Sequence, residues 1–314
     1  MAQAVPAPRA GRPLLTLSRR RTITGLLFAA PWLLGFLLFT LYPMAASLYY
    51  SLTDYSLMQP PTWVGGANYT QLLSDPNFWT ALGNTFYMVV FDLPIFTLLM
   101  FLIALALNQR VRGIGFFRTV FMLPWVMPIA ASATLFYFIF NPDYGLINNA
   151  LDAIGIAGPS WLADASWDKP SLILMDLWTT GFWSILFLAA MQGIPPELYE
   201  AAKLDGAGAW TQTVRITLPL VSPVTLYSLI TGLIATFGYF TQAYIFTANG
   251  SGPGNSLLFY MLYLYNTAFH DLRMGYASAL AWIIFVITLA ASLLLLWSAR
   301  RWTYYEGGTA DGRA

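Results

Sequence analysis

The sequence predicts an all-α polytopic membrane protein with six transmembrane helices. Two features of composition support this class. Of the 314 residues, 58% are hydrophobic and only 9% are charged, whereas soluble domains carry about 25% charged residues. The third observation is that six apolar runs divide the chain, each close to or above the ~20 residues that cross a bilayer as a helix.

The first apolar run, residues 23–41, is predicted to be a retained span, because its 19 residues exceed the apolar core of a typical signal peptide. Residues 1–22 before it are rich in Ala, Pro and Arg and are expected to form a disordered cytoplasmic tail. The predicted membrane domain covers residues 23–298, and a cytoplasmic tail follows at 299–314. The other spans are expected at residues 86–107, 116–140, 171–191, 221–247 and 276–297.

Lys and Arg residues predict the orientation, because cytoplasmic segments of membrane proteins carry an excess of both. With the N-terminus inside, 13 of the 15 Lys and Arg residues fall in inner segments. Only Lys169 and Arg273 fall in outer loops. We therefore expect both termini and the loop between the fourth and fifth spans to lie in the cytoplasm.

The outer loops are longer than the inner ones, except for the inner loop between the fourth and fifth spans. The first, residues 43–85, contains Pro-Pro and Gly-Gly turn signals, and the second, residues 141–170, carries four Asp residues. The third begins with a glycine-rich turn and continues as an aromatic stretch at residues 257–269. This stretch fits either an interfacial helix lying flat on the membrane or a docking surface for an external protein that delivers substrate.

The loop between the fourth and fifth spans, residues 195–219, is the most polar part of the chain, and we call it the polar segment. Pro196 suits the first position of a helix. Glu197 and Glu200 place negative charge near the N-terminus of that helix, where the helix dipole favours it. Gly206 and Gly208 are expected to end that helix. A second short helix is predicted at residues 210–217. One face of the first helix carries mainly small or apolar groups at helical spacing: Leu198, Ala201, Ala202 and Asp205.

Several chemistries are excluded by residue counts. The chain has no cysteine and one histidine, so disulfides, thiolate chemistry and clusters of Cys or His around a metal are not expected. Neither of its two lysines, Lys169 and Lys203, follows a glycine, so a phosphate-binding loop of the Walker A type is impossible. If ATP drives this protein, the ATPase must be a separate chain.

Two acidic residues lie within predicted spans: Asp92 in the second and Asp176 in the fourth. Intramembrane carboxylates are costly and commonly functional. The one basic residue within a predicted span, Arg118, lies near the inner end of the third, so none lies deep in a span to pair with them. A neutral polyhydroxylated solute needs hydrogen-bonding groups and aromatic faces along its path. The predicted path residues are Asp92, Asp176, Trp178, Thr179, Trp183, Thr236, Tyr239 and Gln242. For any one of the aromatic residues, packing is the simpler interpretation.

The polar segment also carries a motif with fixed spacing: Glu200-Ala201-Ala202, three residues, Gly206, nine residues, Ile216-x-Leu218-Pro219. This motif resembles the EAA loop of ATP-binding-cassette (ABC) importer permeases, and the resemblance extends over about residues 26–297. Stretches at residues 116–119, 123–125, 141–145 and 262–269 resemble the carbohydrate-uptake branch, and more narrowly the maltose-type first permease subunit.

This resemblance implies a type I ABC importer permease in which a cytoplasmic EAA coupling helix docks on a separate ATPase. It implies as partners a second permease, two ATPase subunits, an extracytoplasmic sugar-binding protein and a carbohydrate, in a bacterial or archaeal cytoplasmic membrane. No cofactor is expected in this chain, since the partner ATPase binds ATP and Mg²⁺. The residues expected to contact the ATPase or set the turn are Glu200, Ala201, Ala202, Asp205, Gly206, Gly208, Leu218 and Pro219.

The expected function is therefore a non-catalytic subunit that forms half of the path for a di- or oligosaccharide. Two alternatives stay open within transport: the same importer type carrying a glycerophosphodiester or polyol, and an ion-coupled secondary carrier. A membrane-embedded enzyme using Asp92 and Asp176 as acids is a weaker alternative, because the two are far apart in sequence and lack a basic partner.

Overall fold

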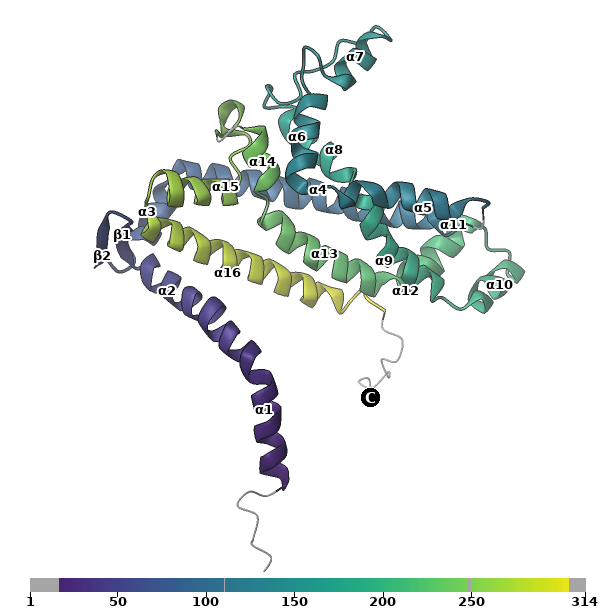
Figure 1. Cartoon of the computed structure of the whole chain (residues 1–314). Helices are drawn as coiled ribbons and strands as arrows, with labels where there is room; N and C mark the ends of the chain where they lie inside the picture. Colours follow the sequence, from purple (N-terminus) through teal and green to yellow (C-terminus); the bar gives the residue numbers. More distant parts are fainter. Residues whose placement is uncertain (1–16, 110, 248–249, 305–314) are drawn as a thin grey trace, which may run out of the picture.

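The computed structural model describes residues 17–109, 111–247 and 250–304, which form a bundle of helices with one small β-hairpin (Figure 1). By length and composition, four helical stretches could cross a membrane: Arg21–Ser51, Pro76–Leu107, Ser222–Phe246 and Met274–Ala299. Two bent helix pairs raise the number to six if each pair is one span. The predictions made for residues 1–16, Arg110, 248–249 and 305–314 concern residues outside the described part.

The first helical stretch projects from the bundle as an arm (Figure 1). It consists of α1 (Leu17–Phe36), a π-helical turn η1 (Leu37–Leu41) and α2 (Tyr42–Ser51). Helix α1 starts at Leu17, so the predicted disordered tail does not extend to residue 22. The most apolar part of the arm has no buried residue, and only its end, α2, packs on the helix that closes the chain, where Trp282 Nε1 lies 3.2 Å from Ser47 Oγ.

The first outer loop, expected as turns, is instead an antiparallel hairpin followed by a short helix. Strand β1 (Thr53–Ser56) pairs with β2 (Gln59–Trp63), with Thr53 opposite Trp63, and α3 (Ala67–Ser74) follows. Asn68 Nδ2 holds the start of the hairpin by donating to the carbonyls of Ser51 and Thr53, both at 2.9 Å. Gly275 allows the hairpin to pack closely, because a Cβ there would lie 2.1 Å from the Thr53 carbonyl oxygen.

Helix α4 (Pro76–Leu107) is the central element of the bundle. It begins ten residues before the predicted span, because Asp75 caps it by accepting a hydrogen bond from the Asn77 amide at 2.9 Å. Its buried side chains contribute to all three hydrophobic clusters of the described chain, through Met88 in one, Phe78 and Leu93 in the second, and Met100 in the third. Pro94 lies inside the helix without ending it.

Asp75 also joins the N-terminal end of α4 to two segments later in the chain. Its Oδ2 accepts hydrogen bonds from the hydroxyls of Tyr263 and of Tyr276, the latter at 2.7 Å. Burial raises the pKa of Asp75, but these hydroxyls and the amides at the helix start outweigh burial and hold the pKa below its usual value. Burial and the Asp75 contact raise the pKa of Tyr263 to about 12.

The third and fourth predicted spans are each broken. The first pair is α5 (Ile114–Met122), continued by the 3₁₀ turn η2 (Leu123–Val126), and α6 (Ile129–Ile139), which meet at 95°. Met127 is extended, with ψ 134°, because the following Pro128 disfavours the helical conformation there. The second pair is α8 (Asp168–Leu177) and α9 (Thr180–Gln192), bent by 51°. Each of these two predicted spans is therefore a bent pair of helices, a shape that the predicted ranges did not specify.

The rest of the described chain is mainly helical, with a long non-helical connection at residues 153–167. The aromatic stretch at residues 257–269 is largely core, because Leu257, Phe259, Tyr260 and Leu262 are buried, so it does not lie flat on a membrane surface as a whole. Only Phe269 near its end is well exposed. The remaining elements are α7 (Leu146–Asp152), α10 (Pro196–Leu204), α11 (Ala209–Gln212), η3 (Thr213–Thr217), α12 (Leu218–Leu220), α13 (Ser222–Phe237), α14 (Thr241–Phe246), η4 (Pro253–Asn255), α15 (Tyr260–Tyr265), η5 (Asn266–His270) and α16 (Met274–Ala299).

The two ends of the bundle differ in what they carry. Helices α10 and α11 of the polar segment lie at one end, and the β-hairpin, α3 and α15 lie at the other (Figure 1). The long helices α4, α13 and α16 run between them (Figure 1). These three helices therefore connect the two ends of the bundle.

Candidate functional site

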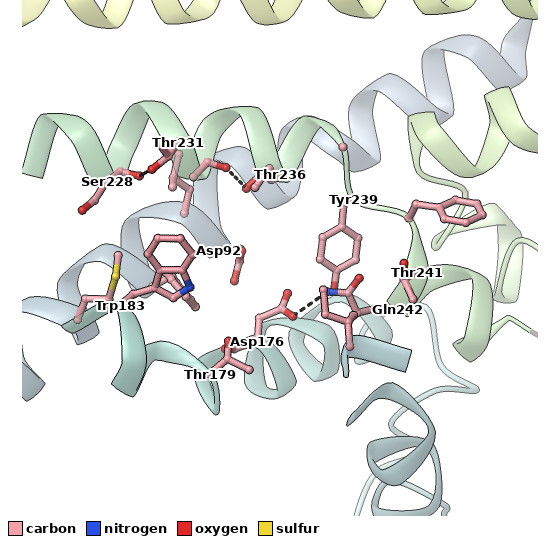
Figure 2. Close-up of a pocket in the computed structure, with 18 residues that line it drawn as sticks. Asp92, Asp176, Thr179, Trp183, Ser228, Thr231, Thr236, Tyr239, Thr241 and Gln242 are labelled. Atoms are coloured by element: carbon pink, nitrogen blue, oxygen red, sulfur yellow. Dashed lines mark hydrogen bonds between the residues drawn. The ribbon is translucent and has the colours of Figure 1, made fainter. Parts of the chain in front are cut away.

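A cavity of about 340 Å³ lies between α4, the α8–α9 pair and the α13–α14 region, and we call it the central cavity (Figure 2). Ligand sites in proteins have volumes of about 300–1,000 Å³, so the central cavity has the size of a small ligand site. Its polar wall combines acidic, amide, phenol and hydroxyl side chains: Asp92, Asp176, Thr179, Ser228, Thr231, Thr236, Tyr239, Thr241 and Gln242.

The structure brings together seven of the eight predicted path residues at this cavity: Asp92, Asp176, Thr179, Trp183, Thr236, Tyr239 and Gln242. Trp178 is the exception. Its ring packs edge-on against Phe136, with the ring centroids 5.0 Å apart, outside the cavity lining. Trp178 therefore has a packing contact that accounts for its aromatic side chain.

Sequence reasoning found only Thr236 of the α13 residues that line the cavity. Ser228, Thr231 and Ala235 line the cavity together with Gly232 and Thr236, and their spacing places all of them on one face of the helix. Extending a helical period backwards from Thr236 would have identified Ser228 and Thr231. Gly232 lets this face approach α4, because a Cβ there would lie 2.4 Å from Leu93 Cδ1.

Breaks in the helices place the remaining cavity residues. Helix α13 ends at Phe237, and Phe240 has φ −140° and ψ −60°, which turns the chain before α14 begins at Thr241. This turn directs Tyr239 and Gln242 toward the α8–α9 pair (Figure 2). On that side the bend follows Asp176, and Thr179 Oγ1 donates to the Asp176 carbonyl at 2.9 Å.

The side chains of Asp92 and Asp176, which we call the acidic pair, accept few hydrogen bonds from the rest of the described protein. Gln242 Nε2 donates to Asp176 Oδ1 at 3.3 Å. Asp92 Oδ1, Asp176 Oδ2 and the hydroxyl oxygens of Ser228 and Tyr239 are buried and have no hydrogen-bond partner among the described residues. Because unpaired buried polar atoms are rare in folded proteins, four at one cavity indicate a place for a polar ligand.

No cation balances the acidic pair at the wall. Among the described residues that line the cavity there is no Lys, Arg or His. The described residues also contain no group of three or more His, Cys, Asp or Glu side chains that could hold a metal ion. The cavity is thus an acidic, hydrogen-bond-accepting site with one indole, Trp183, at its wall.

The polar segment forms a second feature of interest. Helix α10 begins with Pro196, carries Glu197 in its first turn, and reaches its cap at Asp205. Gly206 follows with φ 79°, a conformation that L-residues other than glycine rarely adopt. Gly208 differs from the expectation, because its φ is −70° and it caps the start of α11 instead of ending α10.

The tip of the polar segment is exposed while its base is anchored. Leu204 is 89% exposed and Trp210 is 78% exposed. Glu200, Ala201 and Asp205 are exposed as well. At the base, Tyr199 and Ile216 pack on a cluster that contains Phe187, Met191 and Val221 from the flanking helices. Leu218 and Pro219, in α12, are exposed at this base.

Comparisons with known proteins agree with these features. Over 291 residues the chain is 36% identical to the probable ABC transporter permease protein YesP of Bacillus subtilis (strain 168), covering 92% of this chain and 94% of that protein. It is 38% identical, over 91% of this chain and 97% of the relative, to the lactose transport system permease protein LacF of Rhizobium radiobacter.

A solved structure has the same fold. A chain of a bacterial alginate ABC transporter, in complex with an alginate pentasaccharide-bound periplasmic protein, matches with a TM-score of 0.79 and 26% identity, covering 91% of this chain and 97% of that one. Residues 83–304 match the family described as binding-protein-dependent transport system inner membrane component. The chain therefore belongs to this family of membrane-spanning ABC transporter permease subunits, which confirms the resemblance found in the sequence and assigns ATP hydrolysis to other chains.

Proposed function

We propose that this permease subunit forms half of the translocation path for a neutral di- or oligosaccharide and couples that path to a separate ATPase. The observation that carries the proposal is the central cavity, which lies between the two helical elements that flank the exposed polar segment. The acidic pair, the hydroxyls of α13 and Trp183 would bind the solute there. The similarity to a lactose permease and to an alginate transporter supports a saccharide as cargo.

A saccharide matches the chemistry of the cavity wall. Sugar hydroxyls donate hydrogen bonds, and Asp92 Oδ1 and Asp176 Oδ2 are acceptors without partners among the described residues. The apolar face of a sugar ring stacks on aromatic side chains, a contact that Trp183 can offer. The wall favours a neutral sugar over a glycerophosphodiester, because a phosphate would need cationic groups and no described lining residue supplies one.

The polar segment is the proposed coupling element. Helix α10 follows α9 directly, and the base of the segment packs with side chains of α9 and with Val221 at the start of α13. Both α9 and α13 line the cavity through Trp183 and Thr231. A force applied to α10 by an ATPase would therefore move the cavity wall. We assign contact with the ATPase, or the shape of the turn, to Glu200, Ala201, Ala202, Asp205, Gly206, Gly208, Leu218 and Pro219.

The remaining partners follow from the same arrangement. We propose six spans, counting each bent pair as one, with both termini and the polar segment in the cytoplasm of a bacterial or archaeal cell. The excess of Lys and Arg on that side supports this orientation. A second permease would complete the path, an extracytoplasmic binding protein would deliver the sugar at the opposite end, and ATP and Mg²⁺ would bind to two partner ATPase subunits.

The test is ATP-dependent uptake by the assembled transporter in proteoliposomes, with its partner chains identified by co-purification. Glu200→Lys should reduce uptake to background while the variant still inserts into the membrane, because the reversed charge lies on the exposed face offered to the ATPase. Asp152→Asn, an exposed change on α7, serves as the control. Normal uptake by a well-expressed Glu200→Lys variant, or uptake by this chain alone, would contradict the proposal.

A further inference from the structure

The acidic pair in the central cavity has a consequence for which saccharides can pass. Asp92 and Asp176 are 84 residues apart in the sequence. The fold places them on α4 and α8, and both side chains reach the same cavity (Figure 2). We propose that this pair selects saccharides by charge: the cavity excludes acidic sugars and holds an amino sugar more tightly than the matched neutral sugar. The proposal rests on the proposed function of the cavity as a sugar path.

Exclusion of acidic sugars follows from the charges at the wall. The two carboxylates lie close enough to interact electrostatically with each other, and no described lining residue carries a positive charge. Asp92 is 7% exposed, so solvent screens it poorly. Because two interacting buried carboxyl groups do not readily ionise together, the pair holds one negative charge. A uronate placed between the helices would bring a second negative charge into a site of low dielectric, where repulsion is much stronger than in water.

Preference for an amine follows from the unpartnered atoms. A protonated amine has three N–H donors and one positive charge. The cavity offers four buried oxygens without partners among the described residues, namely Asp92 Oδ1, Asp176 Oδ2, Ser228 Oγ and the Tyr239 hydroxyl. A neutral hydroxyl at the same position donates one hydrogen bond and leaves the charge of the pair uncompensated. Charge-assisted hydrogen bonds are also stronger than neutral ones.

No described residue that lines the cavity offers a positive charge that would reverse the preference for an amine. The only hydrogen bond from a side-chain nitrogen to the acidic pair among the described residues is that from Gln242 to Asp176. The other lining side chains are hydroxyls or apolar groups. Neutral donors of this kind can orient a carboxylate, but they do not provide a counter-charge for an anion.

The absence of native cysteine allows a direct measurement of the charge. A single cysteine introduced as Thr179→Cys lies at the cavity wall, and one introduced as Met58→Cys lies in the exposed turn of the β-hairpin, away from the proposed ATPase contact. Each would be labelled in the assembled transporter with two methanethiosulfonate reagents of similar size, one cationic and one anionic. The Met58→Cys site corrects for the intrinsic reactivity of the reagents.

We expect the cationic-to-anionic rate ratio at Thr179→Cys to exceed that at Met58→Cys by about tenfold or more, because the local potential concentrates cations. Adding Asp92→Asn and Asp176→Asn should bring the two ratios within about twofold of each other. Asp176→Glu should keep the high ratio and shows whether a changed side chain alone perturbs the site. Equal ratios at the two cysteines in the otherwise unchanged protein would overturn the proposal.

The second measurement is protection of Thr179→Cys from labelling by glucosamine, glucose or glucuronate, three sugars that differ mainly in one charged group. We expect glucosamine to protect at the lowest concentration, glucose at a higher one, and glucuronate not at all. Equal protection by all three would reject charge selection but leave the cavity as a sugar path. If none of the three sugars protects, both the charge selection and the proposed sugar path are contradicted. This holds for any result of the labelling-rate measurement.

Discussion

The Tyr199 hydroxyl lies 3.0 Å from Thr217 Oγ1, in hydrogen-bonding distance, and joins α10 to the π-helical turn that leads back to the bundle. This contact spans 18 residues and closes the base of the polar segment. Thr217 is buried there. The contact therefore fixes α10 to the returning part of the polar segment at a defined point.

Removing this hydrogen bond should loosen the polar segment. Tyr199→Phe keeps the ring packing but leaves Thr217 without this partner, a loss of about 0.5–1.5 kcal/mol. We expect faster amide hydrogen exchange in α10 and a several-fold lower uptake per ATP hydrolysed. Thr213→Val, which removes a hydroxyl that bonds the Ala209 carbonyl within its own helical turn, is the control. Unchanged exchange in Tyr199→Phe would show that the hydroxyl contact does not hold the segment.

Gly206 and Gly208 should respond differently to alanine. Gly206 has φ 79°, so Gly206→Ala strains the backbone by about 1–2 kcal/mol although no atom lies within 4 Å of the added Cβ. Gly208 has φ −70° and equally open space, so Gly208→Ala carries no such strain. Circular dichroism and hydrogen exchange of the two variants measure the difference. Equal destabilisation by both changes would contradict the turn geometry.

Gly275→Ala should displace the β-hairpin. The added methyl group would lie 2.1 Å from the Thr53 carbonyl oxygen, so either α16 or the hairpin must move. Overpacking of this kind costs about 1–3 kcal/mol. We expect a lower unfolding temperature in a thermal denaturation assay in detergent. Gly83→Ala in α4, where nothing lies within 4 Å of the added Cβ, is the matched control and should not lower it.

Asp75 should make stability depend on acid pH. Its pKa in the folded protein lies below its usual value of about 3.9. The carboxylate therefore contributes stability that is present above about pH 4 and is lost as pH falls through the lower folded value. We expect Asp75→Asn to unfold at a lower temperature than the unchanged protein at pH 7, with the gap narrowing in acid. A gap that widens below pH 4 would reverse the sign and reject this account.

The sequence by itself determined the membrane class, the approximate positions of the apolar helices and the family. Run length and composition are local properties, and so are the N-terminal proline of α10 and the left-handed glycine at its end, Gly206. Helical periodicity also held enough information to find Ser228 and Thr231 once Thr236 was chosen. These features depend on neighbours within a few residues, which a linear pattern records.

Only the tertiary structure decided which distant residues share a site. It paired Asp92 with Asp176, turned Trp178 away from the cavity, and folded the first outer loop into a hairpin against Gly275. It also bent the third and fourth predicted spans, where hydropathy indicates an apolar run but not its direction. The physical reason is that a helix can present any face to its neighbours until close packing between elements far apart in the chain selects one.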